Sequence, residues 1–223
     1  SLSTSNPSSL EMEELFYAAT LTEDNGTKKV IYASIIEFYP KCWRSVSNAA
    51  AVELDEGNLV IAKELLDKGI ELNANSFEIQ NNMGVYYMMV GDYNKANHSF
   101  NKARELGGDA SYNLGLANIA LGDYARAESL LAGNSCDYNL GLAQLLNGNN
   151  AGAEKTFNCA PQDAETLYLL AITAARQDNK TAMLDYLGQS IKADSEVAKA
   201  ASTDREFLKY YNDVDFTALV NMK

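Results

Sequence analysis

Histidine and proline are scarce in this sequence of 223 residues. His98 is the single histidine, so a catalytic triad or zinc site built on histidine would lack a second imidazole, and we expect His98 to be a solvated surface residue. The three prolines leave long stretches free to form helices. No segment is typical of a strand, so no glycine loop that follows a strand can cradle a phosphate. We therefore expect neither an enzyme nor a cofactor or metal site.

Cysteine is also scarce, with Cys42, Cys136 and Cys159 as its three members. An odd number at irregular spacing, without a Cys-x-x-Cys pair, indicates neither a disulfide framework nor a zinc site. Cys136 and Cys159 fall near the same end of one predicted helix pair, so a bridge between them is the alternative. We favour buried free thiols.

Basic residues are outnumbered, at 18 against 30 acidic ones, for a net charge of −12. Between Gly108 and Pro161 the basic residues are Arg126 and Lys155 alone. A nucleic-acid partner needs a dense basic face, so we expect no binding to nucleic acid, and the acidity favours solubility instead. No apolar run reaches the roughly 18 residues that span a bilayer, so we expect no direct membrane insertion by this segment.

Internal repetition is the main positive signal. The hexapeptide Tyr-Asn-Leu-Gly-Leu-Ala occurs at 112–117 and again at 138–143, and Gly-Asp-Tyr occurs at 91–93 and 122–124. Aligned on these anchors, the chain shows a small residue, a second one twelve positions later, and a large apolar residue four positions after that. The sets are Ala50/Ala62/Leu66, Gly84/Ala96/Phe100, Gly115/Ala127/Leu131, Gly141/Ala153/Phe157 and, more weakly, Ala171/Met183/Leu187.

This spacing predicts pairs of antiparallel helices. The small residues allow two helices to approach closely, and the large residue fills the remaining gap. A turn such as Gly91-Asp92 lies between the helices of each pair, where glycine suits the left-handed end of the first helix and Asp or Asn caps the second. The step from Gly115 to Gly141 is only 26 residues and leaves room for a short second helix, about Tyr124 to Leu131.

The pattern resembles the tetratricopeptide repeat (TPR), whose signature is Trp-x2-Leu-Gly-x2-Tyr, then Ala-x3-Phe, then Pro. Met83-Gly84-x2-Tyr87 with Ala96-x3-Phe100 matches it almost position for position, whereas the Trp and closing Pro positions are mostly lost. The resemblance implies an all-α, TPR-like right-handed α-solenoid of antiparallel helix pairs with a C-terminal capping helix.

The expected organisation is one continuous solenoid domain. Residues 1–9 are Ser-rich and begin at Ser1, so we expect a disordered segment or an artificial edge, and possible membership of a longer chain. We expect a divergent N-terminal helix pair at residues 10–42. Five repeats follow, at about 43–76, 77–107, 108–133, 134–163 and 164–195. Residues 196–223 are expected to form capping helices, because 196–201 and 204–219 carry helical patterns.

In TPR proteins fixed positions of the first helices line a concave groove, and the resemblance carries these positions onto this chain. The candidate peptide-binding residues are Asn81, Val85, Met88, Met89, Tyr112, Leu116, Ile119, Tyr138, Leu142, Leu145, Tyr168, Ile172 and Arg176. An apolar groove with tyrosine rungs suits recognition of a helix or an extended peptide. The alternative is that this lining is buried, by neighbouring repeats or by residues 204–219.

An asparagine recurs just before the Leu-Gly position, as Asn48, Asn82, Asn113 and Asn139. These amides could form a ladder for a bound peptide backbone. We favour a structural role instead, in which each amide satisfies groups of the neighbouring repeat.

The function that this pattern favours is a protein-interaction module, a scaffold or adaptor that binds a protein or peptide partner of unknown identity. A structural spacer or oligomerisation element with a self-filled groove is the main alternative, and a pocket for a small ligand or lipid is a weaker one. The Asn- and Tyr-rich repeats are similar to TPR segments of bacterial cell-envelope proteins, which favours a periplasmic or lipid-anchored location and leaves a cytoplasmic one open.

Overall fold

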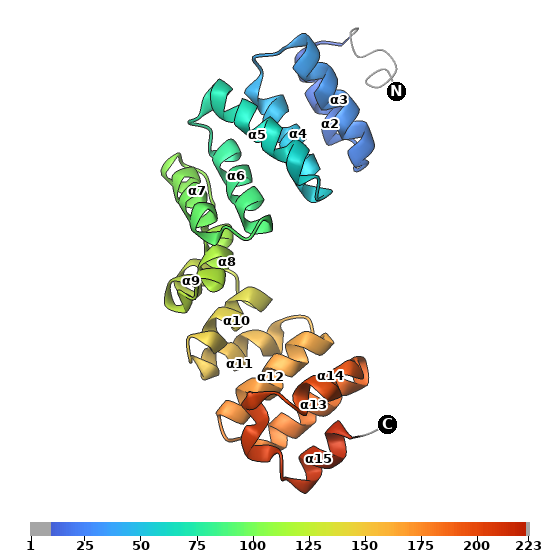
Figure 1. The fold of residues 1–223 in the computed structure, drawn as a ribbon, viewed down its shortest axis with the longest axis vertical. Coiled ribbons are helices and arrows are strands. Elements are labelled where there is room, and N and C mark those ends of the chain that lie inside the picture. The colour runs from blue at the N-terminus through green and yellow to red at the C-terminus, as the bar shows by residue number, and fades with distance from the viewer. Residues whose placement is uncertain (1–9, 222–223) are drawn as a thin grey trace. The chain divides into compact units, whose positions relative to one another are not determined.

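The structure, a computed structural model, describes residues 10–221. Over that range the chain is helical and contains no strand (Figure 1). The chain divides into two compact units, Ser1–Leu121 (unit 1) and Gly122–Lys223 (unit 2), each of which is described by itself. Residues 1–9, for which we expected a disordered or artificial edge, lie outside the described residues.

Between residues 10 and 121, unit 1 contains three helix pairs and one further helix. Its helices are α2 (Met12–Thr20), α3 (Asn25–Phe38), α4 (Trp43–Asp55), α5 (Leu59–Asn73), α6 (Phe77–Met89), α7 (Tyr93–Glu105) and α8 (Ser111–Leu121). Each helix packs on the next along the chain, and α4 also packs on α6. Fully buried side chains such as Ile31, Leu66 and Phe100 form the core between them.

Unit 2 continues the same alternation and ends in an irregular cap. Its elements are α9 (Tyr124–Leu131), α10 (Tyr138–Leu146), α11 (Asn150–Cys159), α12 (Ala164–Arg176), α13 (Lys180–Ala193), α14 (Glu196–Ala201), the 3-10 helix η2 (Arg205–Tyr210) and α15 (Val214–Val220). The main core cluster joins Phe157, Leu170 and Leu187 to Phe207 and Phe216 of the cap. The short second helix predicted at 124–131 is confirmed by α9.

The turns within the pairs adopt the predicted conformation. Gly57, Gly91, Gly122 and Gly148 have φ between 75° and 81°. Asp178 takes the same left-handed conformation at φ 60° in the pair α12–α13, where the sequence offers no glycine. Side chains of Asp92, Asp123, Asn149 and Asn179 accept hydrogen bonds from the first turn of the following helix. The prediction of glycine at the end of one helix and an Asp or Asn cap on the next is confirmed for Gly91-Asp92, Gly122-Asp123 and Gly148-Asn149. In the pair α4–α5 the left-handed glycine is present, but the Asn58 side chain makes no capping hydrogen bond.

The small residues of the repeat do lie where helices approach most closely. A Cβ atom added to Gly84 would come within 2.4 Å of the Phe100 ring, and one added to Gly141 would come within 2.5 Å of the Phe157 ring. Both phenylalanines are buried. The predicted relation between the small residue of the first helix and the large residue of the second is therefore confirmed in α6–α7 and α10–α11.

Our expectation for the cysteines is wrong in two respects. Cys136 and Cys159 form a disulfide, with 4.9 Å between their Cα atoms, and both residues are exposed rather than buried. Cys42 is the free cysteine and is partly exposed. The bridge forms because the turn before α10 and the last residue of α11 meet at one end of the helix pair.

Over 204–219, where the sequence has apolar residues at irregular helical spacing, the capping segment forms two short helical elements. The chain forms η2, turns at 211–213, and starts again as α15. Asp213 begins the new helix, since its carboxylate accepts hydrogen bonds from the backbone N–H groups of Asp215 and Phe216. Phe207 and Phe216 are both buried, and the turn between them brings their rings to 5.7 Å between centroids.

Candidate functional site

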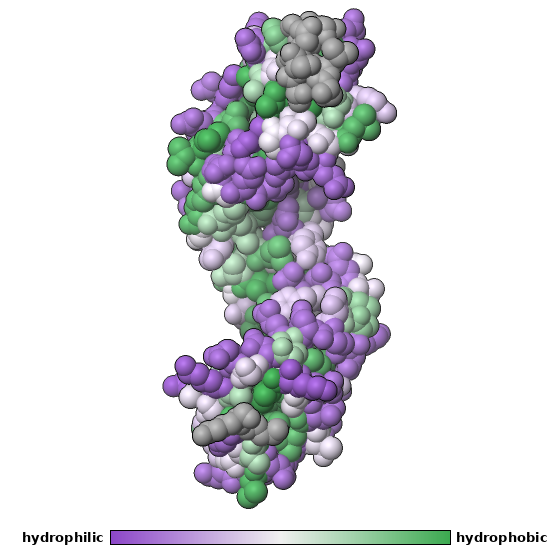
Figure 2. Space-filling model, turned by 90° about the vertical axis from the view of Figure 1, so that its right-hand side faces the viewer, coloured by the Kyte–Doolittle hydropathy of each residue, from purple (hydrophilic) through white to green (hydrophobic). Residues whose placement is uncertain are grey.

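The exposed half of the candidate groove lies in unit 1, on one face of α6 and α8. The seven candidates there, which we call the α6–α8 face, are Asn81, Val85, Met88, Met89, Tyr112, Leu116 and Ile119. All seven are at least partly exposed, with Met89 46% and Tyr112 38% accessible. Figure 2 shows one side of the molecule, on which hydrophobic residues gather in patches among hydrophilic ones. The α6–α8 face is therefore apolar surface that the described residues leave partly uncovered.

Asparagines hold the first helices of unit 1 side by side. Asn82 Nδ2 of α6 donates to the carbonyl oxygen of Ser47 in α4 at 3.1 Å and to its Oγ at 3.2 Å. Asn113 Nδ2 of α8 donates to Asn81 Oδ1 of α6 at 2.9 Å. The favoured structural role is confirmed for Asn82 and Asn113, because their amides bond to the neighbouring pair and not outward.

Acidic side chains accompany this row of helices. Glu78 stands at the start of α6, Asp109 precedes α8, and Asp55 ends α4. Asp55 also lines a pocket of about 350 Å³ between α2, α3 and α4, together with Lys28, Tyr32 and others. Burial raises the pKa of the Tyr32 hydroxyl, and a hydrogen bond with Asn48 partly offsets that rise.

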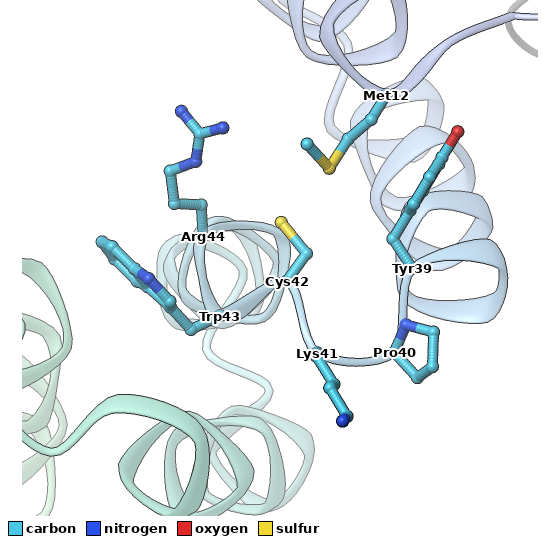
Figure 3. A pocket seen from close by; sticks show the side chains of 7 residues that line it. All are labelled: Met12, Tyr39, Pro40, Lys41, Cys42, Trp43 and Arg44. Carbon is cyan, nitrogen blue, oxygen red and sulfur yellow. The ribbon is translucent and has the colours of Figure 1, made fainter.

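A second pocket in unit 1 was not foreseen from the sequence. It has a volume of about 490 Å³ and is lined by Met12, Tyr39, Pro40, Lys41, Cys42, Trp43 and Arg44. In Figure 3 the side chains of Met12, Tyr39 and Cys42 face a common space, whereas those of Lys41 and Trp43 point away from it. The aromatic run around Pro40 is the signal that could have indicated an apolar surface here.

Arg44 borders this pocket and is held within unit 1. Its guanidinium lies 5.0 Å from the centroid of the Phe16 ring and forms an ion pair of 2.8 Å with Glu13. Both contacts come from α2. The arginine is therefore already paired on the side that faces α2.

In unit 2 the remaining six candidates lie on α10 and α12, and all except the exposed Arg176 are buried or half-buried. Leu145 and Ile172 are buried, at 2% and 7% exposure, and Leu142 is half-buried against the same core. Tyr138 donates its hydroxyl proton to Glu165 Oε1 at 2.6 Å. Burial and this hydrogen bond to a carboxylate raise the pKa of Tyr138 well above its usual value.

The chain's own residues 204–207 cover the end of α12. Tyr168 Oη donates to Asp204 Oδ2 at 2.7 Å, and desolvation followed by this bond raises the pKa of Tyr168. Arg176 holds Glu206 through two hydrogen bonds of 2.8 and 2.6 Å. The buried ring of Phe207 meets the Tyr168 ring edge-on, at 5.7 Å between centroids. These contacts match the self-filled alternative on α12, although not on α6–α8.

Arg176 also connects α12 to α10. Its Nη1 donates to the carbonyl oxygen of Leu145 at 2.7 Å, while its other nitrogens bind Glu206. The hydrogen bond to Glu206, and after it the opposite charge of that residue, raise the pKa of the guanidinium. The cap thus engages both Tyr168 and Arg176, although the Arg176 side chain stays 30% exposed.

Residues 10–221 show no cluster of three or more His, Cys, Asp or Glu side chains that could hold a metal ion. His98 is exposed on α7. No helix within the same range is both long and apolar enough to cross a membrane.

Comparison with known proteins shows the fold. No protein-family model matches the chain, and no curated protein matches its sequence. Among solved structures, YrrB, described as a TPR protein with an unusual peptide-binding site, superposes with a TM-score of 0.66 at 23% identity over 78% of this chain and 98% of its own. PilW, a type IV pilus biogenesis factor, gives 0.68 at 18% over 88% and 96%. PilF of Pseudomonas aeruginosa gives 0.66 at 16% over 89% and 95%. The predicted all-α TPR-like fold is thereby confirmed.

Proposed function

We propose that this chain, which has the fold of tetratricopeptide-repeat proteins, is a non-catalytic protein-binding scaffold that holds a peptide or helix on the α6–α8 face. One observation carries the proposal. The α6–α8 face remains partly exposed, whereas the equivalent face of α12 is covered by the chain's own residues 204–207. YrrB, of similar fold, is described as having a peptide-binding site, which supports this kind of ligand.

The residue types on this face suit an apolar ligand. Met88 and Met89 have flexible, polarisable side chains that adapt to different partner shapes. Leu116 and Ile119 add aliphatic area on α8, and Tyr112 adds a rigid ring with a polar tip. Partly exposed apolar residues gathered on neighbouring helices suit an interaction site. The partner would therefore present apolar residues at helical or alternating spacing.

The charges near this face favour a partner with basic residues beside its apolar ones. Glu78 lies at the start of α6, and Asp109 lies just before α8. Arg44, a basic residue in the same row of first helices, is already paired with Glu13. Complementary charge at a rim speeds association and is screened by salt. The affinity should therefore fall as ionic strength rises.

A site-specific crosslinking experiment tests this proposal. A photo-crosslinking amino acid at Met89 should capture the partner, and the same residue at exposed His98, on the second helix of the same pair, should not. The captured segment is then synthesised and titrated into the purified protein. Val85→Asp or Leu116→Asp should weaken binding at least about tenfold, because either change places a charge in the apolar contact. His98→Asp is the matched control and should bind normally. Equal capture at both positions, or unchanged affinity of both groove variants, would contradict the proposal.

The covered face of α12 supports a second candidate, a structural spacer. In that case the α6–α8 face would also be occupied, by another copy of the chain or by a further segment of a longer one. Fluorescence quenching separates the two, since an unoccupied face leaves Tyr112 accessible to acrylamide and a partner then protects it. Self-association that disappears in Leu116→Asp would favour the spacer.

A location in the bacterial cell envelope accompanies the proposal. Two proteins of similar fold are described as a type IV pilus biogenesis factor and as PilF of Pseudomonas aeruginosa. The disulfide between Cys136 and Cys159 supports the same location, because disulfides persist in oxidising compartments such as the periplasm.

A further inference from the structure

The disulfide of unit 2 encloses one helix pair. Cys136 lies in the turn before α10, and Cys159 is the last residue of α11. The bridge spans 23 positions, so the closed loop contains the whole of α10 and α11. No other covalent link in the described residues joins the two ends of a helix pair in this way.

This helix pair is shorter than the one that follows it. Its helices have 9 and 10 residues, against 13 and 14 in the following pair α12–α13. Beyond Phe157, the buried apolar residues of the pair are Leu140, Ala143, Leu145 and Ala153. Asn150 Oδ1 is buried without a hydrogen-bond partner among the described residues, which is unfavourable. Short helices with a small core depend more on tertiary restraints.

The backbone conformation of Cys136 also depends on the bridge. Cys136 has φ 65°, in the left-handed region that residues other than glycine seldom adopt. The turn that contains it otherwise rests on local hydrogen bonds, such as that from the Asp137 N–H to the Asn134 carbonyl oxygen at 3.2 Å. The bridge to Cys159 holds this residue in an otherwise unfavourable conformation.

The bridge is also accessible from solvent. Both cysteines are exposed, and a pocket of about 350 Å³ beside them is lined by polar groups of Ser135, Gln144 and Lys155 as well as by the bridge itself. An incoming thiolate must reach a disulfide sulfur directly, so access is one of the requirements for exchange, and this bridge meets it.

We propose that Cys136 and Cys159 form a thiol–disulfide exchange site, and that its oxidised state locks the α10–α11 pair in its folded arrangement. When the disulfide between Cys136 and Cys159 forms, the two thiols give up two protons and two electrons. The disulfide of an exchange partner, such as a thiol–disulfide oxidoreductase, accepts these protons and electrons. A thiolate of this chain attacks the partner's disulfide, one partner thiol leaves, and the second thiolate then attacks the mixed disulfide and releases the other. A dithiol reductant runs the same steps in reverse.

Opening the bridge is also expected to affect α12. Leu145 of α10 is buried in the core shared with α12, and its carbonyl oxygen accepts a hydrogen bond from Arg176. Tyr138 of the same helix bonds to Glu165 of α12. Loosening α10 therefore removes contacts from α12, whereas unit 1 has its own core.

Mass spectrometry and hydrogen exchange test the site. The whole chain carrying Cys42→Ser, which removes the third thiol, is treated with oxidised glutathione and then with dithiothreitol. Oxidation should lower the mass by about 2 Da and block alkylation of both cysteines, since each half of the bridge loses its proton. Reduction should then raise amide exchange in 137–159 at least about tenfold and leave 77–105 unchanged. The control is Cys136→Ser/Cys159→Ser, which should exchange as the reduced protein does and ignore dithiothreitol.

Two results would overturn the inference. Cysteines 136 and 159 that remain open to alkylation after the oxidation show that they do not pair. If the disulfide forms but its reduction leaves amide hydrogen exchange in residues 137–159 unchanged, the bridge does not hold the α10–α11 pair in place. Neither result bears on ligand binding by unit 1, which is measured separately.

Discussion

Replacing Gly141 with alanine tests whether the small position of the repeat sets the distance between paired helices. The added Cβ would lie 2.5, 2.7 and 2.9 Å from three ring atoms of Phe157, all closer than real Cβ contacts. The ring has no room to retreat, because Phe157 is fully buried and its centroid lies 6.1 Å from that of Tyr138. The methyl group must therefore push α10 and α11 apart or force the phenylalanine off its rotamer.

The expected cost follows from two opposing effects. Overpacking a filled core costs about 1–3 kcal/mol, and three ring contacts under 3 Å place this site in the upper part of that range. Alanine in a helix interior recovers about 1 kcal/mol relative to glycine. The net change should be a destabilisation of about 1–2 kcal/mol.

A matched glycine in the same unit gives the control. Gly188 lies inside α13, and a Cβ there would meet only Leu219 Cδ1, at an ordinary 3.6 Å. Gly188→Ala should therefore stabilise unit 2, by about 0.5–1 kcal/mol. The same chemical change is thus expected to have opposite signs at two helical positions of one unit.

Urea unfolding followed by circular dichroism measures both changes. Phe157→Leu, which removes the obstructing ring, should cost less stability in the Gly141→Ala background than in the natural sequence, and the difference is the coupling between the two positions. Unfolding of Gly141→Ala at the same or a higher urea concentration than the natural protein would refute close packing at this position. Additivity of the two substitutions would refute it as well.

Three further predictions concern unit 2. Reducing the disulfide should lower the free energy of unfolding by about 3 kcal/mol, the chain-entropy value for a loop of this length, and an unchanged Tm under reducing conditions would contradict this. Tyr138 and Tyr168 have raised pKa values in the folded state, so their stabilisation is complete below pH about 10 and is lost as the pH rises further. Tm should fall between pH 9 and 11, and less so in Tyr168→Phe; an identical fall in that variant would show that Tyr168 does not contribute. Asp163 caps α12, because its carboxylate accepts a hydrogen bond from the Thr166 N–H at 2.8 Å. Asp163→Ala should therefore lower the free energy of unfolding by about 1 kcal/mol, whereas Asp163→Asn should change it little. Equal losses of stability in a denaturant titration would refute a capping role.

Helix pairing could be predicted from the sequence because it rests on local, repeated spacing. A small residue, a second one twelve positions on and a large one after it place two helices in contact, wherever the rest of the chain goes. The short helix α9 follows from the same reasoning, since a 26-residue step leaves no room for a longer one. The left-handed turns follow from glycine, and Asp178 shows that the turn persists where glycine is missing.

The features that could not be predicted depend on how closely particular residues approach one another, within one repeat or between a repeat and the cap. Cys136 and Cys159 are 23 positions apart, and whether they meet depends on how closely two helix ends approach. Arg176 and Glu206 are 30 positions apart and join a repeat to a segment that has no repeat pattern. The break at 211–213 depends on burying two phenylalanines at once. Periodicity carries no information about contacts of this kind.

The contrast between α12 and α6 defines what a ligand of this chain has to supply. Met89 and Arg176 occupy the same repeat position in the resemblance to TPR proteins, yet one is 46% exposed and the other is paired to Glu206. The segment that covers α12 does so with carboxylates for Tyr168 and Arg176 and with the buried ring of Phe207 between them. On α6 the corresponding position offers a thioether and no charge, so an acidic segment would gain nothing there and would meet Glu78 at the start of the same helix. On the proposed function, the α6–α8 face should therefore select against a copy of the chain's own acidic cap and favour an apolar segment with basic neighbours.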